Sequence, residues 1–142
     1  MKNFEEFVRA GTVKKQSPNI HRALSIIKEA GGKKDFLETS LKNIPPEEMN
    51  FNFIADSCYD ILIEFIRAKM LIDGYNSGSS HEAEVSYMRI LGFSESEIRF
   101  MDDLRYYRNG TKYYGAILTK EYANKVLEFM KMVYPKLKEF VK

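Results

Sequence analysis

The sequence predicts an all-α protein, an antiparallel up-and-down bundle of about five helices. Three observations support this fold class. Apolar residues recur at intervals of three and four, no stretch alternates as a strand does, and capping residues, glycines and prolines divide the 142 residues into helix-sized segments. Hydrophobic residues make up 44% of the chain and charged residues 30%, which is typical of a globular domain with a sizeable core.

We expect a single domain over residues 1–142, in which residues 1–15 form a short N-terminal helix and a connector. Phe4 and Phe7 have the spacing of a short amphipathic helix, and Gly11 is placed to end it. The first residues are too acidic and too poor in apolar content for a signal peptide. We therefore expect a cytoplasmic protein.

Ser17 and Pro18 predict the start of the next helix, because serine caps the first free amides and proline fits the first turn. Apolar residues then keep one helical phase across Gly31 and Gly32 until Pro45. Each interior glycine costs about 1 kcal/mol relative to alanine. We expect one long helix that bends at the glycines, and two shorter helices are the alternative.

Asn50 is placed to cap the most apolar helix, which we expect to run to Gly74 and to be the central one. Its apolar residues leave a narrow polar seam of Asp56, Asp60, Glu64 and Arg67. Because the seam carries charge, this segment does not span a bilayer. Asp60 and Glu64 would suit acid–base or metal chemistry, but no second carboxylate cluster has metal-site spacing, so we favour salt bridges to arginines.

A glycine- and serine-rich loop follows Gly74 and ends at Ser79, which with Glu82 predicts a helix start. That helix runs from His81 to Leu91. A very short turn separates it from the next one, so we expect the two to be antiparallel neighbours. A histidine there can reach the polar face of the next helix, although a capping or loop-anchoring role is the alternative.

The stretch from Ser94 to Gly115 carries the most concentrated polar surface. Ser94 and Glu97 form a capping box, and Gly115 can end the helix in a left-handed conformation. One predicted stripe is apolar: Phe100, Leu104, Tyr107, Thr111 and Tyr114. The other is polar: Asp102, Arg105, Arg108, Asn109 and Lys112. A guanidinium beside an amide on a cationic face suits a phosphate better than it suits a core.

The last helix is predicted to begin after Thr119, which can cap it. Pro135 lies inside it and is expected to kink it, because proline lacks a backbone donor and clashes with the preceding turn.

Arg108-Asn109-Gly-Thr-Lys-Tyr113-Tyr114-Gly115, after Arg105-Tyr-Tyr, resembles the late-helix signature of the HEPN superfamily, small helical "higher eukaryote and prokaryote nucleotide-binding" domains. The resemblance is greatest to the archaeal branch and covers most of the chain after about residue 12. The family motif is an Arg, often followed by Asn, and then a His four to six residues later. Arg108 and Asn109 match it, whereas Tyr113 stands at the histidine position. The resemblance implies a HEPN-like bundle.

Three functions compete. The first is a nucleotide- or RNA-binding module in which Arg105, Arg108, Asn109 and Lys112 hold phosphate and Tyr106, Tyr113 or Tyr114 stacks on a base. The second, implied by the resemblance, is a metal-independent ribonuclease toxin that uses Arg108 with His81 or Tyr113. A phenol is a poor base at neutral pH, so Tyr113 does not easily replace the histidine. The third is a structural or protein-interaction bundle, with the arginines paired to carboxylates.

Composition limits the partners. The net charge is +2, too small for nucleic-acid binding by bulk charge, so any polyanion site must be local. The single cysteine, Cys58, excludes an intramolecular disulfide, and no Cys/His spacing suggests zinc; we expect no cofactor. The resemblance implies a homodimer paired through the motif helix, and a minimal nucleotidyltransferase as partner in a toxin–antitoxin pair.

Overall fold

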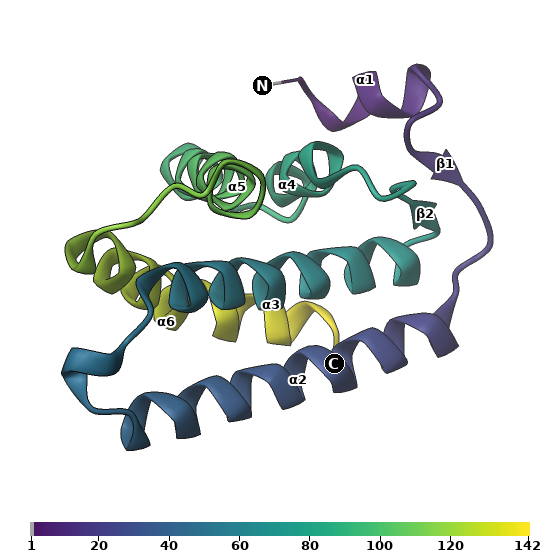
Figure 1. Cartoon of the computed structure of the whole chain (residues 1–142). Helices are drawn as coiled ribbons and strands as arrows, with labels where there is room; N and C mark the ends of the chain where they lie inside the picture. The colour runs from purple at the N-terminus through teal and green to yellow at the C-terminus, as the bar shows by residue number, and fades with distance from the viewer. Residues whose placement is uncertain (1) are drawn as a thin grey trace.

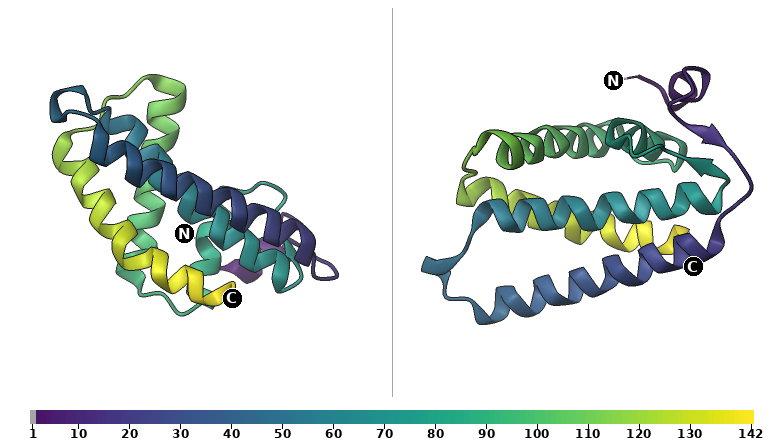
Figure 2. Two further views of the ribbon diagram at one scale, coloured as in Figure 1. Left: turned by 90° about the horizontal axis from the view of Figure 1, so that it is seen from below. Right: turned by 45° about the vertical axis from the view of Figure 1, so that its right-hand side comes forward.

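Helix α3 is the centre of the fold, and four other helices pack against it (Figure 1). The computed structural model describes residues 2–142, and the side chains of all of these except 112–114. The main helices are α2 (Ile20–Asn43), α3 (Phe51–Ile72), α4 (His81–Ile90), α5 (Glu95–Tyr114) and α6 (Lys120–Phe140). Helix α2 lies on one side of α3, α4 and α5 form a layer on the other, and α6 runs alongside (Figure 2). The predicted all-α bundle is confirmed.

The N-terminal segment is tied to the end of α3 by strand pairing, which the sequence did not predict. After α1 (Phe4–Arg9), β1 (Lys14–Lys15) pairs antiparallel with β2 (Tyr75–Asn76). Next to this pair, Gln16 N–H donates to the Gly74 carbonyl over 2.9 Å. Gly74 has φ +88°, and a Cβ there would lie 2.7 Å from the Gln16 carbonyl oxygen, so the close approach requires glycine.

Helix α2 begins later than predicted and has no break. Its cap is Asn19, whose side chain accepts from Arg22 N–H over 3.1 Å, rather than Ser17. The backbone before it is held away from helical geometry, because Asn19 N–H donates to the Leu71 carbonyl at the end of α3. The helix continues through both glycines, so the one-helix interpretation is correct. A 3₁₀ turn, η1 (Pro46–Glu48), leads on to α3.

The core gathers around α3, whose cap Asn50 accepts from Phe53 N–H over 2.9 Å as predicted. Twelve residues of α3 are buried: Ile54, Ala55, Cys58, Tyr59, Ile61, Leu62, Ile63, Phe65, Ile66, Ala68, Met70 and Leu71. A helix buried over so much of its girth needs neighbours on several sides, as observed. None of the described helices combines the length and the apolar character needed to cross a membrane.

The predicted caps of α5 and α6 are confirmed, whereas the predicted cap of α4 is wrong by one residue. The cap of α4 is Ser80, which accepts from Ala83 N–H, whereas Ser79 has φ +67° and lies in the preceding turn. The capping box of α5, the left-handed Gly115 (φ +68°) and the Thr119 cap of α6 match the prediction. Pro135 lies within α6.

The predicted apolar stripe of α5 is partly wrong. Leu104 is fully buried as predicted, but Ile98 and Met101, which are also buried on α5, do not belong to the predicted stripe. Tyr107 is 42% exposed and packs edge to face on Tyr122 of α6, with ring centres 4.8 Å apart. The buried face of α5 is therefore rotated relative to the predicted stripe. Tyr107 lies at the surface, where α5 meets α6.

Candidate functional site

The polar seam of α3 is matched by side chains from three neighbouring helices. The pairs are Asp56 with Thr111 (2.9 Å), Asp60 with Arg108 (2.7 Å), Glu64 with Lys33 (2.6 Å) and Arg67 with Glu84 (2.5 Å). The expected arginine pairing of the seam carboxylates therefore holds for Asp60, whereas Glu64 pairs with a lysine. Within the described residues, no group of three or more His, Cys, Asp or Glu side chains could hold a metal ion.

Arg108 lies between the seam and the surface. Its Nε and Nη2 donate to the two carboxylate oxygens of Asp60 over 2.7 and 3.3 Å, and its side chain is 16% exposed. Burial lowers the pKa of Arg108, but the Asp60 hydrogen bond and the Asp60 and Asp56 charges more than offset it, so the net pKa is raised. The guanidinium is permanently charged, and Nη1 makes no hydrogen bond to a described residue.

The other predicted phosphate ligands divide into three groups. Arg105 is tied to Asp102 on the same helix, with Nε 2.8 Å from the carboxylate. Asn109 is half-buried and its amide makes no hydrogen bond to the described part of the chain. The side chains of Lys112, Tyr113 and Tyr114 lie outside the described residues.

His81 and Arg108 meet at one aromatic ring, that of Tyr59. The His81 ring stacks on Tyr59 with centres 5.7 Å apart, and the Arg108 Cζ lies 5.9 Å from the same ring centre. The Tyr59 hydroxyl is 3.0 Å from His81 Nδ1. Tyr59 itself is fully buried, so the core of the bundle holds both side chains in place.

The surroundings determine the form of the His81 ring. Burial, together with the positive charges of Arg67 and Arg108, lowers the pKa of His81, so its imidazole is neutral near pH 7. Burial also raises the pKa of Tyr59, which keeps its proton. The direction of the bond between that hydroxyl and His81 Nδ1 depends on the tautomer of the imidazole. We assign Tyr59 as the donor, because its hydroxyl has no other hydrogen-bond partner among the described residues; the imidazole proton then lies on Nε2 and His81 presents an N–H donor.

Sequence reasoning missed the residues that organise this site. Tyr59 lies among the buried apolar residues of α3, where its hydroxyl gives no signal in the sequence. Glu84 is completely buried, accepts from Arg67 Nε and Nη2 over 2.5 and 3.1 Å, and also accepts from Ser77 over 2.7 Å. A carboxylate on the inner side of a short amphipathic helix, four residues after its cap, was the available clue.

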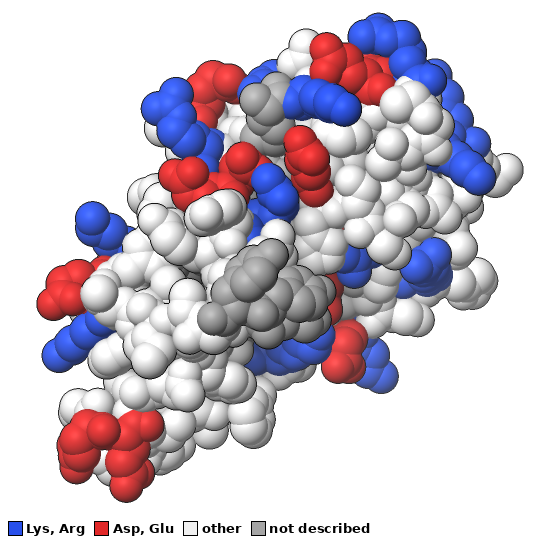
Figure 3. Space-filling model, turned by 45° about the horizontal axis from the view of Figure 1, so that its top comes forward, with Lys and Arg blue, Asp and Glu red and all other residues white. Residues whose placement is uncertain are grey.

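Several charges on the surface lie in opposite pairs. On the face in Figure 3, acidic and basic side chains lie next to one another at several places, with uncharged residues between them. Two such pairs are Arg89 with Glu95 (2.8 Å) and Lys136 with Glu97 (3.0 Å). Long-range attraction of a polyanion is therefore weak here, and recognition depends on local contacts.

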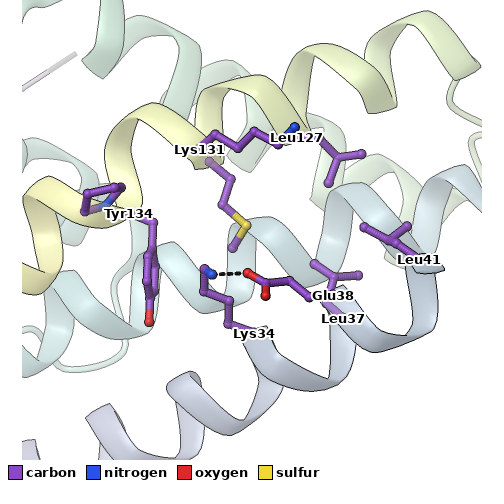
Figure 4. A pocket seen from close by; sticks show the side chains of 9 residues that line it. Lys34, Leu37, Glu38, Leu41, Leu127, Lys131 and Tyr134 are labelled. Carbon is purple, nitrogen blue, oxygen red and sulfur yellow. Dashed lines mark hydrogen bonds and ion pairs between the residues drawn. The ribbon is translucent and has the colours of Figure 1, made fainter.

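A second concavity lies away from these residues, between α2 and α6 (Figure 4). It has a volume of about 240 Å³ and mainly apolar walls that include Leu37, Leu127 and Met130. The polar residues at its rim interact with one another: Lys34 pairs with Glu38, and the Lys34 Nζ lies 4.5 Å from the centre of the Tyr134 ring. None of the predicted site residues whose side chains the structure describes lines it.

The geometry thus brings Arg108, His81 and Asp60 together and leaves Arg105 paired along its own helix. Comparisons with protein-family models, with curated proteins and with solved structures give no match for this chain.

Proposed function

We propose that this protein is a HEPN-type nucleotide- or RNA-binding module that holds a phosphate at Arg108, His81 and Asn109. The observation that carries the proposal is the pair of donors on the Tyr59 ring. Arg108 Nη1 and His81 Nε2 are N–H groups without a described partner, one of them permanently charged, and the Asn109 amide is likewise unpaired. Phosphate oxygens accept such hydrogen bonds, and an arginine adds charge.

The Asp60 pair is what a structural role predicts, and it also leaves Arg108 able to bind a ligand. It fixes the guanidinium through Nε and Nη2 and leaves the remaining nitrogen for a ligand. A fixed donor loses little conformational freedom on binding. The Asp60 side chain is 33% exposed, so solvent screening weakens the repulsion between its charge and a bound phosphate.

The ribonuclease alternative is favoured by the proximity of His81 to Arg108 and opposed by the tautomer of His81. A general base needs a free lone pair, and the Tyr59 hydroxyl occupies Nδ1. Cleavage would therefore require this hydrogen bond to break or to reverse its direction first. Binding requires no such rearrangement.

The test compares Arg108→Gln with Arg89→Gln, which removes the same charge from a surface pair on α4. Labelled single-stranded RNA and ATP are titrated at fixed salt after circular dichroism has verified folding. Loss of one charged hydrogen bond costs about 2 kcal/mol, so we expect roughly thirtyfold weaker binding for Arg108→Gln and little change for Arg89→Gln. Equal affinity of wild type and Arg108→Gln would remove the proposal.

The same samples test the nuclease alternative. Incubation of RNA with the wild type in EDTA should leave it intact. Cleavage by wild type but not by His81→Ala would replace the binding module with the ribonuclease.

We also propose that the module is a homodimer that pairs through α5 and its surroundings. Tyr106 is 71% exposed and Ile117 is 87% exposed, and Tyr106 continues an aromatic row through Tyr107 to Tyr122. Exposed apolar side chains that adjoin one another are typical of partner surfaces. Light scattering at micromolar concentration should give twice the 16.6 kDa of one chain, and a 16.6 kDa species alone would contradict the dimer.

The nucleotidyltransferase partner rests on the resemblance alone. The neighbouring reading frames test it, because a nucleotidyltransferase gene next to this one supports the paired system and its absence supports a solitary binding protein.

A further inference from the structure

A cavity between α2 and α3 adjoins the proposed phosphate site. It has a volume of about 430 Å³, and Asp60, the partner of Arg108, forms part of its wall. Pockets for small molecules usually measure about 300–1,000 Å³. Gly32 lines the cavity on the α2 side. The space next to it is empty, because a Cβ placed there would meet no atom within 4 Å.

Two phenylalanines from the facing helices line this cavity. Phe36 of α2 is 67% exposed and Phe53 of α3 is 47% exposed, and no other phenylalanine in the described part of the chain is as exposed. Their rings contribute little to the core. Aromatic faces that line a cavity and remain open to solvent are suited to stack on a planar ring.

The polar groups of the cavity include both donors and acceptors. Lys33 uses one of its three ammonium N–H groups for Glu64, which lies 2.6 Å away. Asp60 accepts two hydrogen bonds from Arg108, but a carboxylate has about four acceptor positions, so two remain. Ser57 and Glu29 also line the cavity. A ligand that fits these groups carries N–H donors on a planar ring.

We propose that this cavity binds a nucleobase with an exocyclic amino group, stacked on Phe36 and Phe53 and donating to Asp60. The inference rests on the proposed function and deepens it, since Asp60 then contacts the base while Arg108 holds the phosphate of the same nucleotide. A purine without the amino group loses this hydrogen bond to Asp60. The site therefore selects adenine over a purine that lacks the 6-amino group.

The test uses AMP and purine riboside 5′-monophosphate, which differ only in the 6-amino group. Titrations are followed by calorimetry or by NMR shifts in the intact protein. We expect AMP to bind about tenfold more tightly, because the unsubstituted purine loses a hydrogen bond to a charged acceptor. Equal affinities would overturn the inference.

Two glycine variants locate the base. Gly32→Leu places a side chain at the cavity, whereas Gly31→Leu adds the same side chain to the same helix at a position that does not line it. Neither glycine has an atom within 4 Å of an added Cβ, so both variants should fold. Gly32→Leu should abolish the AMP preference and Gly31→Leu should keep it. An unchanged preference in Gly32→Leu would place the base elsewhere.

Ribose 5-phosphate, which lacks the base, separates this inference from the phosphate proposal. If Arg108→Gln weakens its binding but AMP and purine riboside 5′-monophosphate bind equally to the wild type, the base site is wrong and the phosphate site stands. If Arg108→Gln leaves it unchanged while Gly32→Leu removes the AMP preference, the base site stands and the phosphate assignment is wrong.

Discussion

The buried ion pair of Glu84 and Arg67 allows a sharp test of what stabilises the bundle. Glu84 has no exposed surface, whereas the Arg67 side chain is 25% exposed. Arg67→Met would remove the fork that holds the carboxylate and leave Ser77 as its remaining described partner. The result is a charge in the core without a counterion.

The expected cost follows from that burial. Breaking a buried pair by removing one partner costs about 3–5 kcal/mol, and the partial exposure of Arg67 places this pair at the lower end, about 3 kcal/mol. Replacing both residues in Arg67→Met/Glu84→Met removes the charge as well as its partner. The double variant should then lie about 1–2 kcal/mol below the wild type, because paired removal avoids the uncompensated charge and leaves only the Ser77 hydroxyl without its acceptor.

Urea unfolding at 25 °C and pH 7.5 measures these free energies, with the slope against urea as the check on two-state behaviour. Arg89→Met is the matched control, because its partner Glu95 is exposed and such pairs contribute less than about 1 kcal/mol. A double variant no more stable than Arg67→Met, or a cost below about 1 kcal/mol for Arg67→Met, would refute the argument.

Three further predictions concern local features. Gly31→Ala and Gly32→Ala should each raise the free energy of unfolding by about 1 kcal/mol, because both lie in a continuous helix with open space at Cβ; unchanged or lower values in urea would contradict this. The lowered pKa of His81 means that its neutral form stabilises the fold fully above pH ~6.5 and that this contribution is lost as the pH falls below it. Stability of His81→Gln should therefore fall less than wild type between pH 7.5 and 5.5 in thermal melts, and parallel curves would count against it. Asn52 donates to the Ala116 carbonyl over 2.7 Å and accepts from Leu118 N–H over 2.8 Å, so Asn52→Ala should destabilise by about 1–2 kcal/mol in urea, and a loss below ~0.3 kcal/mol would show that the connection holds without it.

Local signals in the sequence predicted helix ends well. The capping box of Ser94 and Glu97 and the left-handed Gly115 depend on residues within one turn, so their geometry follows from the local sequence. Ser17 failed for the opposite reason. Its neighbourhood pairs with the end of α3, more than fifty residues away in the chain, and tertiary hydrogen bonds override a good local cap.

Some residues of the candidate site could be predicted from the sequence, but their hydrogen-bond partners could not. The spacing placed Arg105 and Arg108 on one face, yet it could not show that Arg105 stays with Asp102 while Arg108 reaches Asp60, 48 positions earlier in the chain. The role of Tyr59 was invisible, because a tyrosine on an apolar face resembles any other core aromatic until its hydroxyl has a partner. Pairing across helices is a property of their packing, which single-helix periodicity does not contain.

The attachment of α2 has a mechanical consequence. At its N-terminal end the β1–β2 pair and the Asn19 and Gln16 hydrogen bonds fasten the chain to α3, and at the other end η1 leads directly into α3. Ordinary helices fray from their tips, but this one is anchored at both tips and has its lowest intrinsic propensity in the middle, at two adjacent glycines. We therefore expect thermal bending of α2 to concentrate at Gly31 and Gly32, in the middle of the helix. Gly32 lines the cavity next to Asp60.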